Sequence, residues 1–338
     1  MPHIKFFKNI TKKDVAIAGG KGASLGEMIN NKIPVPDGFV VLAGAFDRFL
    51  KETDLNASIL AELKKVKLDD VNSVDKASAV IRDMIHDQEM PKDLTKEILE
   101  EFDKLFDLDS RLRGNDNCFV AVRSSATAED SQVASWAGEL ETYLNTTREN
   151  VVERVRNCWS SLFTPRAIFY RHEKKLIDHY VSVAVAVQKM IQSEISGIVF
   201  TVHPVTEDRN QLIIEAGYGL GEAIVSGQIT PDSYVVLKSE MSILDVSVST
   251  QTRKLMRNVR NAKIAKIRKS DDDVANEWIE LSRNEGWKQK LTSKQIIELA
   301  KLCVKIEKHY QFPCDIEWAY AEGKFYITQS RPITTLKS

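Results

Sequence analysis

The sequence predicts an α+β protein with two lobes and mostly antiparallel sheets. Between about residues 45 and 108, apolar residues recur at helical spacing. From 181 to 237 the pattern changes to short β-branched runs separated by Gly and Pro, which is typical of antiparallel strands. We therefore expect an N-terminal lobe over residues 1–180 and a sheet-rich C-terminal lobe over 181–338.

The composition is that of an ordinary globular protein, with 338 residues, 43% apolar and 28% charged. The net charge of −1 gives no overall field that favours nucleic acid or a membrane surface as a partner. We find no signal peptide and no apolar stretch near 18 residues. The four cysteines are scattered without C-x-x-C spacing, which disfavours a zinc site or disulfide framework and is consistent with a reducing cytoplasm.

The first elements follow from local signals. The Gly-rich segment "AGGKGAS" predicts a turn, "SLGEMINN" a short helix, and "IPVPDGFVVL" a loop that leads into a strand. The helical region 45–108 has breaks near Asp69–Asp75 and at Pro91. "FVAVRSS" (119–125) predicts a strand, and "VVERVRNCWSSLF" predicts a helix over 148–179.

The second half is expected to form strands at 181–191, 196–202, 211–217 and 232–237. Residues 253–269 carry eight Lys or Arg and no acid, which usually indicates a solvated surface segment. A helix then begins at a capping box of Thr292 and Gln295. Its predicted apolar stripe consists of Ile296, Ala300, Cys303, Ile306 and Tyr310.

The last segment, "FPCDIEWAYAEGKFYITQSRPIT" (312–334), predicts two strands around a Gly turn. Side chains alternate along strands and cross-strand partners share a face. If Gly323 is the centre of a three-residue loop, Asp315 faces Arg331 and Glu317 faces Gln329. A two-residue turn would instead place these side chains on opposite faces.

An exposed polar face with a surface ion pair is one interpretation of this hairpin. However, its neighbours Ile316, Trp318, Phe325 and Ile327 are apolar, which is unusual for a plain surface. Carboxylate and amide oxygens suit Mg²⁺, a hard cation. A nearby Arg can bind phosphate through its bidentate fork. Metal, phosphate and sheet together indicate a nucleotide site.

Three further motifs have both a functional and a structural interpretation. Lys21 stands among glycines before a helix, which suits an anion, although the segment lacks Walker A spacing. Arg123 ends a strand, and the later loop around Gly138 could complete a phosphate clamp, or the segment is an ordinary strand–turn–helix junction. "EAGYGLGEAIVSG" has the wrong spacing for a Rossmann fingerprint, so we expect a tight or mobile loop near the site.

In this order the segments resemble the N-terminal nucleotide-binding domain shared by phosphoenolpyruvate synthase, pyruvate phosphate dikinase and rifampicin phosphotransferase. The strongest matches are "VAVRSSATAEDSQVASWAGELETYLN" and "DIEWAYAEGKFYITQSRPIT", and the resemblance runs from about residue 15 to 334. The synthase branch is the most similar. The resemblance implies an ATP-grasp-like fold with ATP held between two lobes, and a phosphotransferase of the pyruvate, water dikinase type.

The resemblance also implies roles for particular residues. Lys21 and Arg123 would contact the ATP phosphates, beneath a loop around Gly138. Adenine would meet the hinge strand at Gln188, Lys189 and Met190. The hairpin would bind Mg²⁺ and phosphate, with Glu317 and Gln329 on the metal, Arg331 on the phosphates and Asp315 nearby. Among these residues, Lys21, Arg123 and Arg331 would be catalytic.

The chain departs from the synthases in one large respect. It contains no Thr-Ser-His carrier motif, and it stops soon after "QSRPIT". We therefore expect the phosphohistidine carrier domain and the pyruvate-binding domain to be supplied in trans or by missing sequence. The alternatives are the ATP domain of an antibiotic (rifampicin-type) phosphotransferase and a nucleotide-sensing module without turnover.

Overall fold

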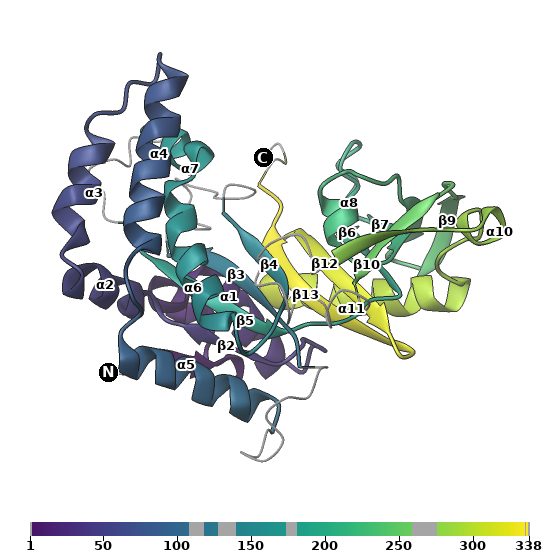
Figure 1. Cartoon of the computed structure of the whole chain (residues 1–338). Coiled ribbons are helices and arrows are strands. Elements are labelled where there is room, and N and C mark those ends of the chain that lie inside the picture. Colours follow the sequence, from purple (N-terminus) through teal and green to yellow (C-terminus); the bar gives the residue numbers. More distant parts are fainter. Residues whose placement is uncertain are drawn as a thin grey trace. The chain divides into compact units, whose positions relative to one another are not determined.

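A computed structural model describes residues 2–107, 118–127, 140–173, 181–258, 276–334 and 336 (Figure 1). It confirms the predicted α+β class, because helices accompany sheets whose named strands all pair antiparallel. The chain forms two compact units. Unit 1 comprises Met1–Glu27 and Asp37–Met190, and unit 2 comprises Met28–Pro36 and Ile191–Ser338. The lobe boundary after residue 180 stays a prediction.

Unit 1 contains a five-stranded sheet. Its strands, in spatial order, are β1 (Ile4–Phe6), β2 (Gly38–Val41), β5 (Val183–Lys189), β3 (Val120–Ala126) and β4 (Thr142–Thr146). One face of this sheet packs into the core of unit 1. Its core side chains include Phe39, Val120, Val122, Val183, Val185 and Val187. The other face carries small and polar residues, as described below.

The helices of unit 1 pack on this sheet or on one another (Figure 1). They are α1 (Val15–Asn30), α2 (Ala43–Glu52), α3 (Leu55–Leu63), α4 (Val71–His86), α5 (Lys92–Leu105), α6 (Val151–Ser160) and α7 (Pro165–Glu173). The helical pattern predicted for 45–108 is confirmed. The single helix predicted over 148–179 is wrong, because a 3-10 turn at Ser161–Phe163 separates α6 from α7. Pro165 starts α7, a position where its missing N–H costs nothing.

Unit 2 contains a six-stranded sheet. Its strands, in spatial order, are β13 (Lys324–Pro332), β12 (Cys314–Ala321), β6 (Ile195–Phe200), β7 (Gln211–Tyr218), β8 (Asp232–Leu237) and β9 (Ser242–Ser247). Helix α11 (Ser293–Tyr310) packs against this sheet. The unit also contains α8 (Glu222–Val225), α10 (Arg283–Gly286) and a ribbon of β10 (Arg253–Arg257) with β11 (Asn276–Glu280).

The capping box of α11 is confirmed, since Thr292 and Gln295 exchange both hydrogen bonds. Its predicted apolar stripe is buried except for Tyr310, which is half-buried. The predicted strands correspond to β5, β6, β7 and β8, but β5 belongs to the sheet of unit 1. No helix within the described ranges is long and apolar enough to cross a membrane.

Candidate functional site

The hairpin of β12 and β13 brings the predicted polar residues together. Asp315 lies opposite Arg331, and Glu317 lies opposite Gln329, so the predicted pairing is confirmed. Arg331 donates from Nε and Nη2 to Oδ2 of Asp315, at 2.8 and 2.6 Å. Asp315 and Gln329 are only 9% and 7% exposed, so the interpretation as an exposed polar face is wrong for these two side chains.

The turn of the hairpin differs from the prediction. Ala321 pairs with Lys324, which leaves the two residues Glu322 and Gly323 in the turn, both with positive φ. The predicted three-residue loop is therefore wrong.

A β-bulge compensates for the shorter turn. Trp318 pairs with Ile327 but Glu317 pairs with Gln329, so Thr328 is an extra residue on β13. This extra residue restores the equal-parity pairing beyond it. The polar side chains of the two strands consequently share one face of the sheet.

A third carboxylate lies on the same face. Glu317 is opposite Ile198 of β6, which is in turn opposite Glu215 of β7. Burial raises the pKa of Glu215, and the charge of Asp315 raises it further. Burial also raises the pKa of Asp315, and the Arg331 charge opposes that rise. This face therefore concentrates partly buried carboxylates whose negative charges disfavour one another.

The donor set of the hairpin fits Mg²⁺. Glu317 offers a carboxylate and Gln329 an amide oxygen from directly opposite positions, and Mg²⁺ prefers oxygen ligands. In the parts of the chain that the structure describes, no three His, Cys, Asp or Glu side chains converge to hold a metal. Mg²⁺ commonly uses one or two carboxylates together with substrate phosphates, so the pair is sufficient for a metal that arrives with a nucleotide.

The raised pKa of Glu215 predicts a pH-dependent stability effect. The unfolded carboxyl ionises at lower pH than the folded one, so its burial destabilises the folded state increasingly as the pH rises through that interval. Glu215→Gln should therefore raise the melting temperature near about pH 8. The gain should shrink as the pH falls toward 4.5, the ordinary value for glutamate.

Differential scanning fluorimetry across this pH range measures the effect. Glu240→Gln is the matched control, because Glu240 is exposed in the turn after β8. An equal, pH-independent shift in both variants would contradict the assigned cause.

In unit 1, the Gly-rich segment lies within α1, which is kinked at Gly19, so the predicted break before a helix is present but falls inside a longer helix. Only Gly19 departs from helical geometry, with φ 68° and ψ 172°. Lys21 therefore lies in the first turn of the helix that continues to Asn30. Ser125 fixes this turn to β3, since its hydroxyl accepts from the Gly22 N–H at 3.2 Å and donates to the Ala18 carbonyl at 3.0 Å.

Arg123 and Gln188 share the second face of the unit 1 sheet. The Arg123 Nη1 donates to Gln188 Oε1 at 3.5 Å, and both residues are buried. Arg123 lies opposite Ala186, and Gln188 lies opposite Ala121 and Gly38. Thr142 lies opposite Arg123 on its other side, so the cross-strand neighbours of the two polar side chains are all small.

The serines after Arg123 have structural roles that the sequence did not reveal. Ser125 contacts α1, as described above. Ser124 points to the opposite face, where its hydroxyl lies 3.0 Å from the Glu141 carbonyl and 2.9 Å from Ser161 Oγ. The alternation of side chains along β3 could have predicted this difference, because it puts Arg123 and Ser125 on one face of the sheet and Ser124 on the other.

The predicted residues Lys189 and Met190 lie at the C-terminal end of β5. The Lys189 N–H donates to the Asp37 carbonyl at 2.8 Å, and the Met190 N–H donates to the Phe119 carbonyl at 2.9 Å. The Lys189 ammonium lies 5.3 Å from the centre of the Phe106 ring. Gly138 lies outside the described residues.

The sequence also matches a known protein family. A family model described as the pyruvate phosphate dikinase AMP/ATP-binding domain matches residues 15–338. The chain belongs to this family. It is thus an ATP-binding domain of the kind found in phosphoenolpyruvate synthase-like enzymes, and its α+β fold agrees with the ATP-grasp-like domain of pyruvate phosphate dikinase.

Curated relatives align with 98–100% of this chain. A probable phosphoenolpyruvate synthase of Methanocaldococcus jannaschii is 45% identical over 339 residues, which are 100% of this chain and 27% of the relative. The phosphoenolpyruvate synthase of Pyrococcus furiosus is 40% identical over 99% of this chain and 44% of its own length. The phosphoenolpyruvate synthase of Aeropyrum pernix is 39% identical over 98% and 42%. The chain therefore spans less than half the length of each of these relatives.

Proposed function

We propose that this chain binds MgATP and activates it for transfer of a phosphoryl group to a histidine outside this sequence, and ultimately to pyruvate. The observation that carries this proposal is the register of β12 and β13, which sets two carboxylates, an amide and a guanidinium on one sheet face. The curated relatives are phosphoenolpyruvate synthases, which favours this proposal over an antibiotic phosphotransferase. All four cysteines are unpaired, which favours a reducing compartment such as the cytoplasm.

In unit 2, Glu317 and Gln329 would hold Mg²⁺ and Arg331 would contact the phosphates. Asp315 accepts two hydrogen bonds from Arg331 and thereby orients the guanidinium, whose side chain stays 40% exposed. When bound, Mg²⁺ would neutralise charge that develops on the transferred phosphoryl group. Arg331 would add a fixed positive charge next to the metal-binding pair.

In unit 1, Lys21 and Arg123 would bind the phosphates. Lys21 stands in the first turn of a helix, where the helix dipole favours anions, and Arg123 is held against Gln188 on a face of small residues. The loop around Gly138 would cover the phosphates. Adenine would be recognised at Gln188, Lys189 and Met190, at the end of β5.

A comparison of two ligands tests the phosphate role of Arg123. Because adenosine lacks phosphates, Arg123→Ala should weaken MgATP binding by about tenfold or more, which is at least ~1.4 kcal/mol, and should weaken adenosine binding much less, through the lost contact with Gln188 alone. Isothermal titration calorimetry with each ligand measures both affinities.

Arg166→Ala is the matched control for Arg123→Ala, because Arg166 is exposed on α7 of the same unit. The control should bind both ligands as the unaltered chain does. Equal losses of ATP and adenosine in Arg123→Ala would indicate a distorted unit 1 and would remove the phosphate assignment.

A further inference from the structure

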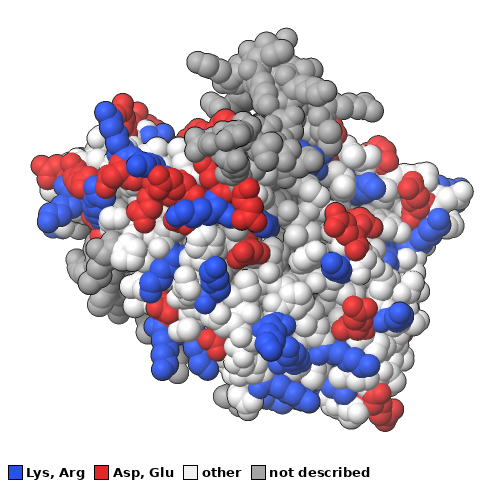
Figure 2. Space-filling model, turned by 90° about the horizontal axis from the view of Figure 1, so that it is seen from below, with Lys and Arg blue, Asp and Glu red and all other residues white. Residues whose placement is uncertain are grey.

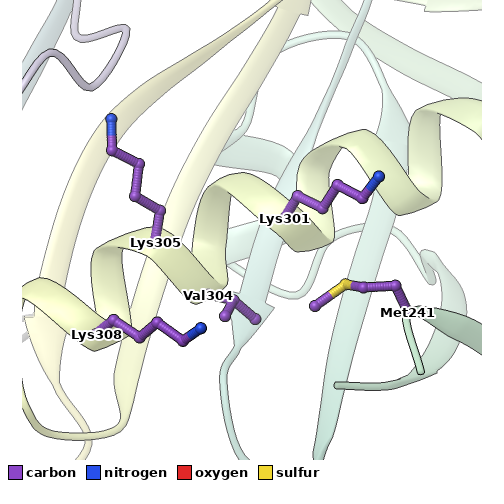
Figure 3. Close-up of a pocket in the computed structure, with 5 residues that line it drawn as sticks. All are labelled: Met241, Lys301, Val304, Lys305 and Lys308. Carbon is purple, nitrogen blue, oxygen red and sulfur yellow. The ribbon is translucent and has the colours of Figure 1, made fainter. Parts of the chain in front are cut away.

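A pocket of about 360 Å³ in unit 2 contains none of the residues assigned to ATP. It is lined by Met241, Lys301, Val304, Lys305 and Lys308 (Figure 3). Four of these residues come from one side of α11, where residues three and four apart are neighbours. Met241 comes from the turn between β8 and β9.

The three lysines of this pocket carry positive charge without a carboxylate partner in the described parts of the chain. Among the residues that the structure describes, Lys305 donates from Nζ only to the backbone carbonyl of Asn31, at 3.3 Å. In contrast, Lys238 of the adjacent turn pairs with Glu307 at 2.8 Å. Like charges at i and i+4 destabilise a helix, so Lys301 and Lys305 repel each other, and a bound anion would reduce that repulsion.

The pocket also has an apolar floor. Figure 3 shows Val304 facing the thioether of Met241, with Lys308 and Lys301 on either side and Lys305 extending away. Methionine adapts readily to an incoming apolar group. A purely anionic ligand would leave this floor in water, and a purely apolar ligand would desolvate ammonium groups without compensation. The occupant therefore needs both kinds of group.

The setting favours a docked chain segment. Elsewhere on the surface Lys and Arg side chains are interspersed with acidic ones (Figure 2), whereas the pocket side of α11 presents three lysines without a carboxylate partner among the described residues. Lys301 and Lys308 are both exposed, and their separation of seven residues is about 10 Å along the helix axis. In an extended peptide alternate residues share one face, so acidic residues two positions before and two positions after an apolar residue face the helix together with it and lie about 13 Å apart, within reach of the flexible lysine side chains.

We propose that this pocket docks an acidic segment of a partner protein, in which two carboxylates flank one large apolar side chain. The carboxylates would bind the ammonium groups of Lys301 and Lys308. The apolar side chain would cover Val304 and Met241. This interaction is independent of the nucleotide site, so ATP is not expected to compete with it.

Fluorescence anisotropy with a labelled peptide of sequence Glu-Ser-Leu-Ser-Glu, whose Glu and Leu side chains share one face when it is extended, tests the proposal. The double variant Lys301→Gln, Lys308→Gln should bind the peptide at least about tenfold more weakly, or ~1.4 kcal/mol. The double variant Lys294→Gln, Lys324→Gln is the matched control, since both lysines are exposed in unit 2 outside the pocket, and it should bind normally. Circular dichroism should show that both variants are folded.

Three further binding experiments test which chemical groups of the peptide the pocket recognises. Replacing the peptide Leu by Ser, or both Glu by Gln, should each weaken binding, and MgATP should not displace the peptide. An equal loss of peptide affinity in the control variant, or undiminished binding of the Ser peptide, would show that binding follows the overall positive charge of the surface and would contradict the proposal. Competition by inorganic phosphate or by anionic lipid vesicles at lower concentration than the peptide would overturn the proposed occupant.

Discussion

Replacing Glu317 by Ala is expected to weaken MgATP binding by about tenfold to a hundredfold, because loss of a direct metal ligand should cost at least as much as loss of a supporting partner. The same variant should bind ATP without Mg²⁺ almost as the unaltered chain does. The reason is the pairing of Glu317 with Gln329, which offers two oxygen ligands from adjacent strands. Calorimetric titrations of ATP with and without Mg²⁺ separate the two effects.

Lys324→Ala is the control for this experiment, because Lys324 is exposed on the same hairpin. Its affinity for MgATP should not change. An unchanged MgATP affinity in Glu317→Ala would remove the metal assignment, whereas equal losses with and without Mg²⁺ would indicate that the hairpin has lost its shape.

Gly19→Ala is expected to destabilise unit 1 by about 2–5 kcal/mol. A Cβ at this position would lie 2.2 Å from Ser125 Oγ and 2.3 Å from the Ser125 carbonyl oxygen. The positive φ of 68° adds about 1–2 kcal/mol for a residue with a side chain, and the overlap adds about 1–3 kcal/mol. Chemical denaturation followed by circular dichroism measures the loss.

Two other glycines separate these contributions to the Gly19→Ala effect. Gly227 has a φ of 69° but open space where a Cβ would lie, so Gly227→Ala should cost only about 1–2 kcal/mol. Gly44 has open space and lies in α2, so Gly44→Ala should be neutral or stabilising by up to about 1 kcal/mol. If Gly19→Ala costs no more than Gly227→Ala, the contact between α1 and β3 is not the cause.

The face of the hairpin could be predicted from the sequence, but its backbone path could not. Alternation predicted that Asp315 faces Arg331, and it does. The sequence contains no local signal for the bulge at Thr328, so it did not reveal that the turn is one residue shorter than predicted. The predicted pairing was thus correct although the predicted turn was wrong.

Long-range strand order accounts for most of what the sequence did not reveal. Val183 to Gln188 is buried on both faces, so its apolar pattern cannot tell which sheet β5 joins. Glu215 joins the polar face only because β6 lies between β7 and β12, and local spacing carries no such information. The short strands β1 and β4 likewise depend on their partners for recognition as strands.

We propose that this chain activates ATP but lacks the histidine that carries the phosphoryl group, and its own histidines are consistent with that proposal. None of them lies in a Thr-Ser-His motif: they are His3, His86, His172, His179, His203 and His309. His203, the one at the end of a predicted strand, accepts from the N–H groups of Val205 and Thr206 at 3.2 Å, which holds its ring in a turn. A ring held in this way is unsuited to carry a phosphoryl group between sites.

The most direct test of this proposal is to measure the formation of phosphoenolpyruvate from MgATP and pyruvate. The chain alone should form none and should hydrolyse ATP slowly at most. Addition of a separately produced fragment that carries the histidine and pyruvate-binding domains of a relative should give phosphoenolpyruvate. Phosphoenolpyruvate formed by the chain alone, or none formed when a folded fragment is added, would contradict the proposed function.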